Sequence, residues 1–226
     1  MYFVANWKMY GDLKSIKSLD KVIKFSKSNK NYKFKMIYCP PNTLLYPLAN
    51  KLKKSNISIG AQNCHSLESY GPFTGSVSSK MIKNIGAEFV ILGHSENRSS
   101  GETDFLINKK IKSSINNGLK VIFCFGETLN QRKKKLTNKI LFNQIKKGVS
   151  LIKKKQNIIF AYEPIWSIGT GALLKKNDLE KDVRFIKNIL KKKLKIINPK
   201  VIYGGSVNPK NINDLKEINN IDGFLI

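Results

Sequence analysis

The sequence has few acidic residues, few cysteines and no long apolar run. Asp and Glu together number 15 against 41 Lys and Arg, which gives the 226-residue chain a formal net charge of +26. No run of 18 apolar residues occurs, so the sequence predicts no transmembrane helix. The N-terminal segment MYFVANWKMYG also lacks the long apolar stretch of a secretory signal. We therefore expect a soluble, cytoplasmic protein with no membrane partner.

Cysteine and histidine are too sparse to indicate a disulfide framework or a metal centre. The three cysteines, Cys39, Cys64 and Cys124, are odd in number and show neither CxxC nor Cys/His ligand spacing. This pattern argues against a disulfide-stabilised secreted domain and against a zinc site. We expect three reduced thiols and no metal.

The excess of lysine invites a nucleic-acid-binding interpretation, which the pattern does not support. The lysines are spread along segments of helical spacing and form no zinc-finger, RNP or basic-zipper motif. Abundant Lys, Asn and Ile together are also what a coding bias toward A and T would give. We expect no specific nucleic acid partner, although a basic field would favour anionic small substrates.

Apolar, often β-branched runs alternate with segments of helical periodicity along the whole chain. Continuous apolar strands are typical of a parallel sheet covered on both faces, and their alternation with helices is typical of βα units. Eight such runs predict a (β/α)₈ barrel or a doubly wound sheet, in a single α/β domain spanning 1–226. The runs lie at 3–7, 35–39, 57–62, 88–93, 121–125, 157–162, 200–205 and 223–226.

Polar side chains follow several of these runs. Asn6 and Lys8 follow the first run, His94 the fourth and Glu163 the sixth. A lone His or Glu is more often structural than catalytic, but the carboxyl ends of barrel strands converge on one rim, where such barrels place function. A carboxylate, an imidazole, a cation and an amide at one rim can together serve proton abstraction beside a carbonyl.

The segment AYEPIWSIGTG, residues 161–171, places Glu163 between an apolar strand and an unusual loop. Pro164 bars helix continuation, and two glycines permit backbone geometry that other residues resist. A solvated glutamate before an ordinary loop is the simpler interpretation. Its neighbours instead favour a pivoting lid over 164–174, in which Trp166 is either a rigid part of the lid or a core aromatic.

Seven motifs resemble those of the triosephosphate isomerase family, in the family's order and approximate spacing. They are ANWKMYG, GAQNC, PFTGSVS, VILGHSENR, CFGETL, AYEPIWSIGTG and YGGSV. The resemblance runs from residue 3 to residue 226 and implies a TIM barrel without a metal or organic cofactor. It also implies the interconversion of dihydroxyacetone phosphate and D-glyceraldehyde 3-phosphate through an enediol(ate), a reaction of glycolysis and gluconeogenesis.

The resemblance assigns catalytic roles to residues of this chain. Glu163 matches the base that moves a proton between adjacent carbons, and His94 matches a neutral imidazole that polarises the carbonyl. Lys8 matches a cation facing oxyanion and phosphate charge, and Asn6 matches an amide donor to substrate oxygen. Glu96 matches a carboxylate that orients Lys8 and His94.

The resemblance also implies a phosphate site and an oligomer. The substrate phosphate would be bound by a second group of residues together with Asn6 and Lys8. These are Gly169, Gly204, Gly205 and Ser206. The loop 64–76, with Thr74 at its tip, resembles a finger that enters the neighbouring subunit, so a homodimer is expected.

Three departures from the family pattern accompany these matches. Residues 172–174 read Ala-Leu-Leu where the family usually has a KTA-type hinge, so the resemblance does not fix the rate at which the lid opens. Ser76 stands where a Glu is usual, and Asn97 where an Arg is usual. The sequence given ends at Ile226, so the family's last phosphate loop and last helix are expected to be lacking. An alternative function is therefore a decayed or truncated barrel that binds phosphorylated metabolites or a partner with little turnover.

Overall fold

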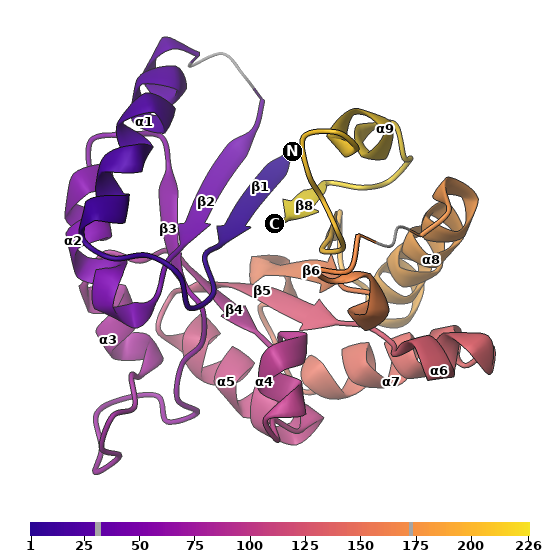
Figure 1. The fold of residues 1–226 in the computed structure, drawn as a ribbon. Helices are drawn as coiled ribbons and strands as arrows, with labels where there is room; N and C mark the ends of the chain where they lie inside the picture. Colours follow the sequence, from indigo (N-terminus) through magenta and orange to yellow (C-terminus); the bar gives the residue numbers. More distant parts are fainter. Residues whose placement is uncertain (30–32, 172–173) are drawn as a thin grey trace.

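The structure is a computed structural model that describes residues 1–29, 33–171 and 174–226. Eight parallel strands close into a barrel in sequence order, and β1 pairs with both β2 and β8 (Figure 1). This closure confirms the (β/α)₈ prediction and excludes the doubly wound sheet. The strands are β1 Tyr2–Asn6, β2 Lys35–Cys39, β3 Ser58–Ala61, β4 Phe89–Leu92, β5 Lys120–Phe125, β6 Ile158–Tyr162, β7 Lys200–Tyr203 and β8 Gly223–Leu225.

Helices follow the strands and surround the barrel (Figure 1). They are α1 Leu19–Ser28, α2 Asn42–Leu52, α3 Ser79–Asn84, α4 Ser95–Ser99, α5 Asp104–Asn116, α6 Leu129–Lys133, α7 Thr137–Gly148, α8 Lys176–Asn188 and α9 Ile212–Lys216. A 3-10 turn, Lys14–Ser18, leads into α1, and a π-helical turn, Ile189–Lys193, ends α8. Among the described residues, no helix combines the length and apolar character needed to cross a bilayer.

Two apolar layers hold the barrel together, and strand β4 shows how one sequence supplies both. Phe89 and Ile91 belong to the cluster inside the barrel, whereas Val90 and Leu92 belong to the cluster between the barrel and its helices. Side chains alternate faces along a strand. All four are fully buried, which explains why the run is apolar without alternation. The three cysteines are free and buried in the structure.

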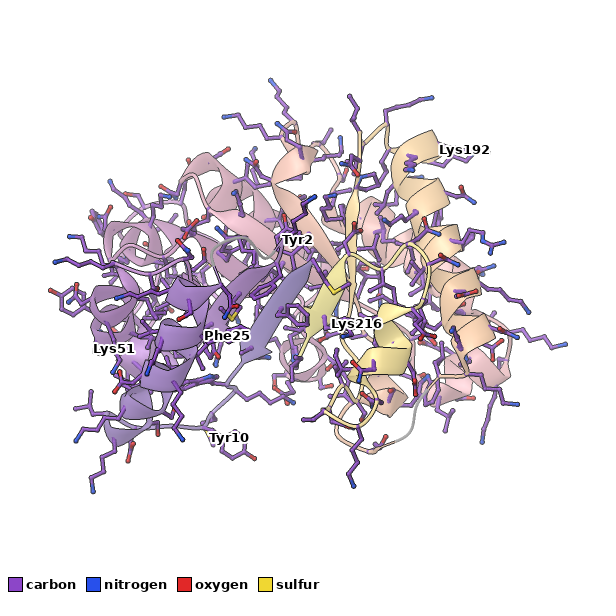
Figure 2. The ribbon with its side chains drawn as sticks, turned by 90° about the horizontal axis from the view of Figure 1, so that it is seen from above. Tyr2, Tyr10, Phe25, Lys51, Lys192 and Lys216 are labelled. Atoms are coloured by element: carbon purple, nitrogen blue, oxygen red, sulfur yellow. The ribbon has the colours of Figure 1, made fainter. Side chains whose placement is uncertain are left out.

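The strand direction gives the barrel two different rims. Figure 2 shows Tyr10, which lies beyond the end of β1, at the lower edge of the molecule, and Tyr2, at the start of that strand, nearer the middle. Lys192, in the turn that ends α8, lies toward the same side as Tyr2. The predicted site residues follow the strand ends and so belong to the rim near Tyr10.

Candidate active site

Four of the predicted site residues meet at this rim. Asn6 ends β1, Lys8 follows it, and His94 is the N-cap of α4 directly after β4. These three and Glu96 line a cavity of about 280 Å³. That volume lies just below the ~300–1,000 Å³ typical of small-molecule pockets, so the cavity suits a compact ligand.

Glu163 and His94 form a buried pair beside this cavity. Glu163 immediately follows β6, and its Oε1 lies 3.5 Å from His94 Nε2. Their side chains are 3% and 6% exposed. His94 Nδ1 accepts the Glu96 N–H at 3.3 Å, so the geometry assigns the ring proton of a neutral imidazole to Nε2. A donor on His94 and a carboxylate on Glu163 therefore face each other without bulk water.

Burial makes the Glu163 carboxylate an unusually strong base for its type. Desolvation raises the pKa of Glu163 above its ordinary value because a low-dielectric site disfavours the charged form. Interactions with His94, the Cys124 thiol and Lys8 oppose this effect, but they do not cancel it. Burial in the structure as it stands therefore raises the basicity of Glu163 without any movement of the lid.

Lys8 has a constrained backbone and an ion pair. Its φ is +51°, in the left-handed region that non-glycine residues rarely adopt. Its N–H donates to Asn6 Oδ1 at 3.1 Å, and its carbonyl accepts from Gln62 Nε2 at 2.7 Å. Lys8 Nζ lies 2.6 Å from Glu96 Oε1. A partly exposed pair of this kind contributes only about 0–1 kcal/mol to stability, so its consequence is to aim the ammonium group.

The surroundings of the Glu96 carboxylate give it a different role from that of Glu163. Burial alone would raise the pKa of Glu96, but the hydrogen bond from Lys8 and nearby positive charge outweigh it, and the pKa is lowered. Glu96 is therefore suited to remain ionised as an orienting group. The two carboxylates at this rim are pushed in opposite directions by their surroundings.

Of the predicted phosphate residues, Asn6 and Lys8 line the cavity, whereas Gly169, Gly204, Gly205 and Ser206 lie outside its lining. The Ser206 hydroxyl donates to the Ser167 carbonyl at 2.6 Å and accepts the Gly171 N–H at 3.1 Å, which ties the lid to the loop after β7. Gly169 has a φ of +67°. Ser206 therefore contacts the lid at Ser167 and Gly171, on either side of Gly169, and its hydroxyl is engaged by these protein groups.

Gly204 and Gly205 have spatial roles that the sequence did not reveal. The Gly204 N–H donates to the Tyr162 carbonyl at 2.9 Å, so it is committed to the barrel. A Cβ at Gly204 would lie 2.8 Å from Glu163 Cγ, and one at Gly205 would lie 2.0 Å from the Tyr203 hydroxyl. Gly204 thus leaves room for Glu163 where a phosphate donor was expected.

A buried polar network beneath the lid was missed by sequence reasoning. The Tyr162 hydroxyl lies 2.9 Å from Asp182 Oδ2 and 3.2 Å from Glu127 Oε1, and Arg132 Nη1 donates to the same two carboxylates. The guanidinium lies 5.8 Å from the centre of the Trp166 ring. Glu127 follows strand β5 in the motif CFGETL, but nothing in the sequence pairs it with Asp182.

Trp166 lies near the start of the predicted lid, and the predicted hinge lies at its far end. Trp166 is partly buried against the core and starts the lid within the short helical turn Ile165–Ser167, so both sequence interpretations describe part of its environment. Ala172 and Leu173 of the predicted hinge lie outside the described residues. Leu174 is buried.

The predicted finger, 64–76, projects from the body between β3 and α3 (Figure 1). Its base is closed by the His65 N–H, which donates to the Val77 carbonyl at 2.8 Å, and its His65 and Phe73 rings are 4.3 Å apart. Thr74 and Ser76 are exposed near its end. Within the described ranges, no group of His, Cys, Asp and Glu side chains has the arrangement of a metal site.

The raised pKa of Glu163 predicts a pH-dependent effect of Glu163→Gln on stability. A pKa raised by folding contributes stability below the unfolded value, and this contribution is lost as pH rises through the folded value. The amide variant does not ionise. The stability of Glu163→Gln relative to the natural chain should therefore increase as pH rises from about 4.5, the ordinary value, through the raised pKa of the folded state, and level off above it.

Urea unfolding of both chains across this pH range measures the difference. Glu217→Gln is the matched control, because it makes the same chemical change on a side chain that is 70% exposed. If the difference in unfolding free energy between Glu163→Gln and the natural chain does not change with pH, Glu163 ionises in the folded chain at no cost in free energy.

Comparison with known proteins identifies the family. The family model described as "Triosephosphate isomerase" matches residues 1–226. Triosephosphate isomerases of Carboxydothermus hydrogenoformans and Dictyoglomus thermophilum are 41% and 39% identical, covering 100% and 98% of this chain and 91% of each relative. The crystal structure of triosephosphate isomerase from Bartonella henselae superposes with a TM-score of 0.90 at 32% identity, covering 100% of this chain and 91% of that one. The chain belongs to the triosephosphate isomerase family.

Proposed function

We propose that this chain is a triosephosphate isomerase that interconverts dihydroxyacetone phosphate and D-glyceraldehyde 3-phosphate. The observation that carries the proposal is the 3.5 Å approach of the buried Glu163 carboxylate to His94 Nε2, beside a cavity lined by Lys8 and Asn6. A strong carboxylate base and a neutral imidazole donor are what proton transfer next to a carbonyl requires. Family membership supplies the substrate.

In the first step, Glu163 removes a proton from C1 of dihydroxyacetone phosphate. The electron pair of that C–H bond forms the C1–C2 double bond, and the carbonyl π electrons move onto O2. His94 Nε2–H and the Lys8 ammonium stabilise the charge on O2, and Asn6 donates to a substrate oxygen. Preorganised donors of this kind are each worth roughly 10²–10³-fold in rate.

In the second step, the same groups complete the isomerisation. The imidazole transfers a proton between O1 and O2, so that the enediolate charge moves to O1. The protonated Glu163 returns its proton to C2 as the C1 carbonyl forms. No atom or electron is gained or lost overall, so the reaction needs no redox cofactor.

The lid and the loop after β7 would bind the phosphate. Ser206 already bonds Ser167 and Gly171 of the lid. When substrate binds, the Ser206 hydroxyl would leave these lid contacts and bond to the phosphate. The Gly169 N–H would donate to the same phosphate, and the lid would close over the site. Closure would exclude water and protect an enediolate that could otherwise eliminate phosphate. We propose no phosphate bond for Gly204, whose N–H is committed to Tyr162. A barrel without turnover, the alternative function, has no observation in its favour among the described residues.

Moving either partner of the buried pair should reduce turnover. Glu163→Asp withdraws the carboxylate by about one methylene, and a misplacement near 1 Å can cost roughly 10²-fold. His94→Gln should lose at least about 10²-fold, because it removes one donor to the developing charge. Both losses should fall on kcat far more than on KM in a coupled assay of isomerisation.

The control is Glu217→Asp, which makes the same chemical change on an exposed side chain and should retain full activity. Unchanged kcat in both site variants would remove Glu163 and His94 from the mechanism. An inactive natural chain would instead favour the barrel without turnover.

We also propose that the chain forms a homodimer through the finger 64–76. The finger exposes apolar side chains, including Tyr70 and Phe73. The segment after β1 exposes Met9 and Tyr10, and Figure 2 shows Tyr10 projecting from the molecule. A two-fold axis would bury each finger against the other subunit's segment, as self-complementary interfaces require.

The departures at Ser76 and Asn97 are compatible with this dimer. Removing one member of a buried ion pair costs roughly 3–5 kcal/mol, whereas replacing both can be almost neutral. Ser76 and Asn97 together represent the second case. The interface would therefore depend on apolar contact in place of that pair.

Sedimentation should give twice the 25.7 kDa chain mass at micromolar concentration. The double variant Tyr70→Ser, Phe73→Ser should shift the chain toward one subunit, because it removes apolar area from the finger. Phe105→Ser is the control, since Phe105 is exposed on α5, outside the finger. A natural chain that sediments as a single subunit would contradict the dimer.

A further inference from the structure

The Arg98 side chain contacts the carboxyl ends of strands β4 and β5. Strand β4 leads to His94, the proposed electrophile, and the end of β5 binds the backbone of Glu163, the proposed base. Its Nε donates to the Gly93 carbonyl at 2.7 Å, and its Nη2 donates to the Cys124 carbonyl at 3.2 Å. Its Nη1 donates to Asp104 Oδ1 at 2.7 Å. All three nitrogens of the guanidinium group thus have a protein partner, and the side chain is 14% exposed.

The two carbonyls that Arg98 binds are next to the catalytic geometry. Gly93 directly precedes His94. Cys124 directly precedes Phe125, whose carbonyl accepts the Glu163 N–H at 2.9 Å. A shift of either strand end would therefore change the separation of the imidazole and the carboxylate.

The packing around Gly93 leaves little tolerance for such a shift. A Cβ at Gly93 would lie 2.8 Å from the Cys124 carbonyl oxygen and 3.1 Å from Arg98 Nη2. Asp104, at the start of α5, accepts from Nη1 of the same guanidinium. Because the guanidinium is planar, its donors point in fixed directions, and a lysine cannot reproduce the three bonds.

We propose that Arg98 is a positioning residue that sets the distance between His94 Nε2 and Glu163 Oε1 by holding the Gly93 and Cys124 carbonyls. Arg98 does not line the active-site cavity, so it acts through the two strand ends. The inference rests on the proposed isomerase reaction for its kinetic consequence, and on the observed contacts alone for its structural one.

Kinetics of Arg98→Lys and Asp104→Asn test the proposal. Arg98→Lys keeps the charge but cannot span the three acceptors, so kcat should fall about 10²-fold, the order expected for a misplacement near 1 Å, while KM stays within about twofold. Asp104→Asn, which retains the carbonyl bonds, should show a smaller loss of kcat. Arg184→Lys is the matched control, because Arg184 is exposed on α8, and should leave both constants unchanged.

A second readout separates positioning from stability and from the proposed reaction. The NMR signal of the His94 Nε2–H proton should shift in Arg98→Lys and stay in place in Arg184→Lys, with assays run well below each melting temperature. This measurement tests the geometry even if the natural chain shows no turnover, in which case the proposed function fails by itself. An unshifted His94 signal, a kcat within twofold of the natural chain, or a kcat restored by stabilising osmolytes would overturn the role of Arg98.

Discussion

The burial of one ionisable carboxylate, Glu163, is the constraint on which the rest of the site depends. An ion at a 3% exposed position costs free energy that surrounding groups only partly offset. Burial at this point requires the barrel to close around it, with glycine on either side. A Cβ at Gly126 would lie 1.8 Å from the Glu163 carbonyl oxygen, and one at Gly204 would lie 2.8 Å from its Cγ. The glycines directly after β5 and β7 thus leave room for the backbone and the side chain of Glu163, respectively.

The remaining polar groups of the rim follow from that placement. His94 faces Glu163 through Nε2 because its Nδ1 is engaged by the backbone of α4. Lys8 is held in a left-handed conformation by bonds at both its N–H and its carbonyl. A net charge of +26 adds a field that favours a doubly charged phosphate substrate. The proton-transfer groups are thus two neighbouring side chains, whereas the electrostatic attraction for substrate arises from the charges of the whole chain.

Much of the fold and the main site residues could be predicted from the sequence because their signals are local. Strand β4 reads as four consecutive apolar residues, and His94 follows it after one glycine. Glu163 similarly follows β6 with no intervening residue. Closure of the barrel then brings these strand ends together, so periodicity and strand direction carry the prediction.

The groups that position the site could not be predicted in the same way. Arg98 and Gln62 donate to backbone carbonyls. Every residue has a carbonyl, so the residue types in the sequence do not indicate which carbonyl a side chain will bind. Glu127 and Asp182 share the partly buried Arg132 although they lie far apart along the chain. Gly204 was expected to bind phosphate, whereas its hydrogen bond and its missing side chain give it a place in the barrel. Such roles depend on three-dimensional proximity, which motif spacing does not encode.

Direct titration of the Glu163 carboxyl tests the central claim most directly. In a ¹³C NMR titration of the chain labelled at its glutamate side-chain carboxyl carbons, the Glu163 resonance is the one missing from Glu163→Gln. We predict that this resonance titrates above 4.5, the ordinary value for a glutamate, because burial disfavours its charged form. A Glu163 resonance that titrates at or below 4.5 would contradict the account.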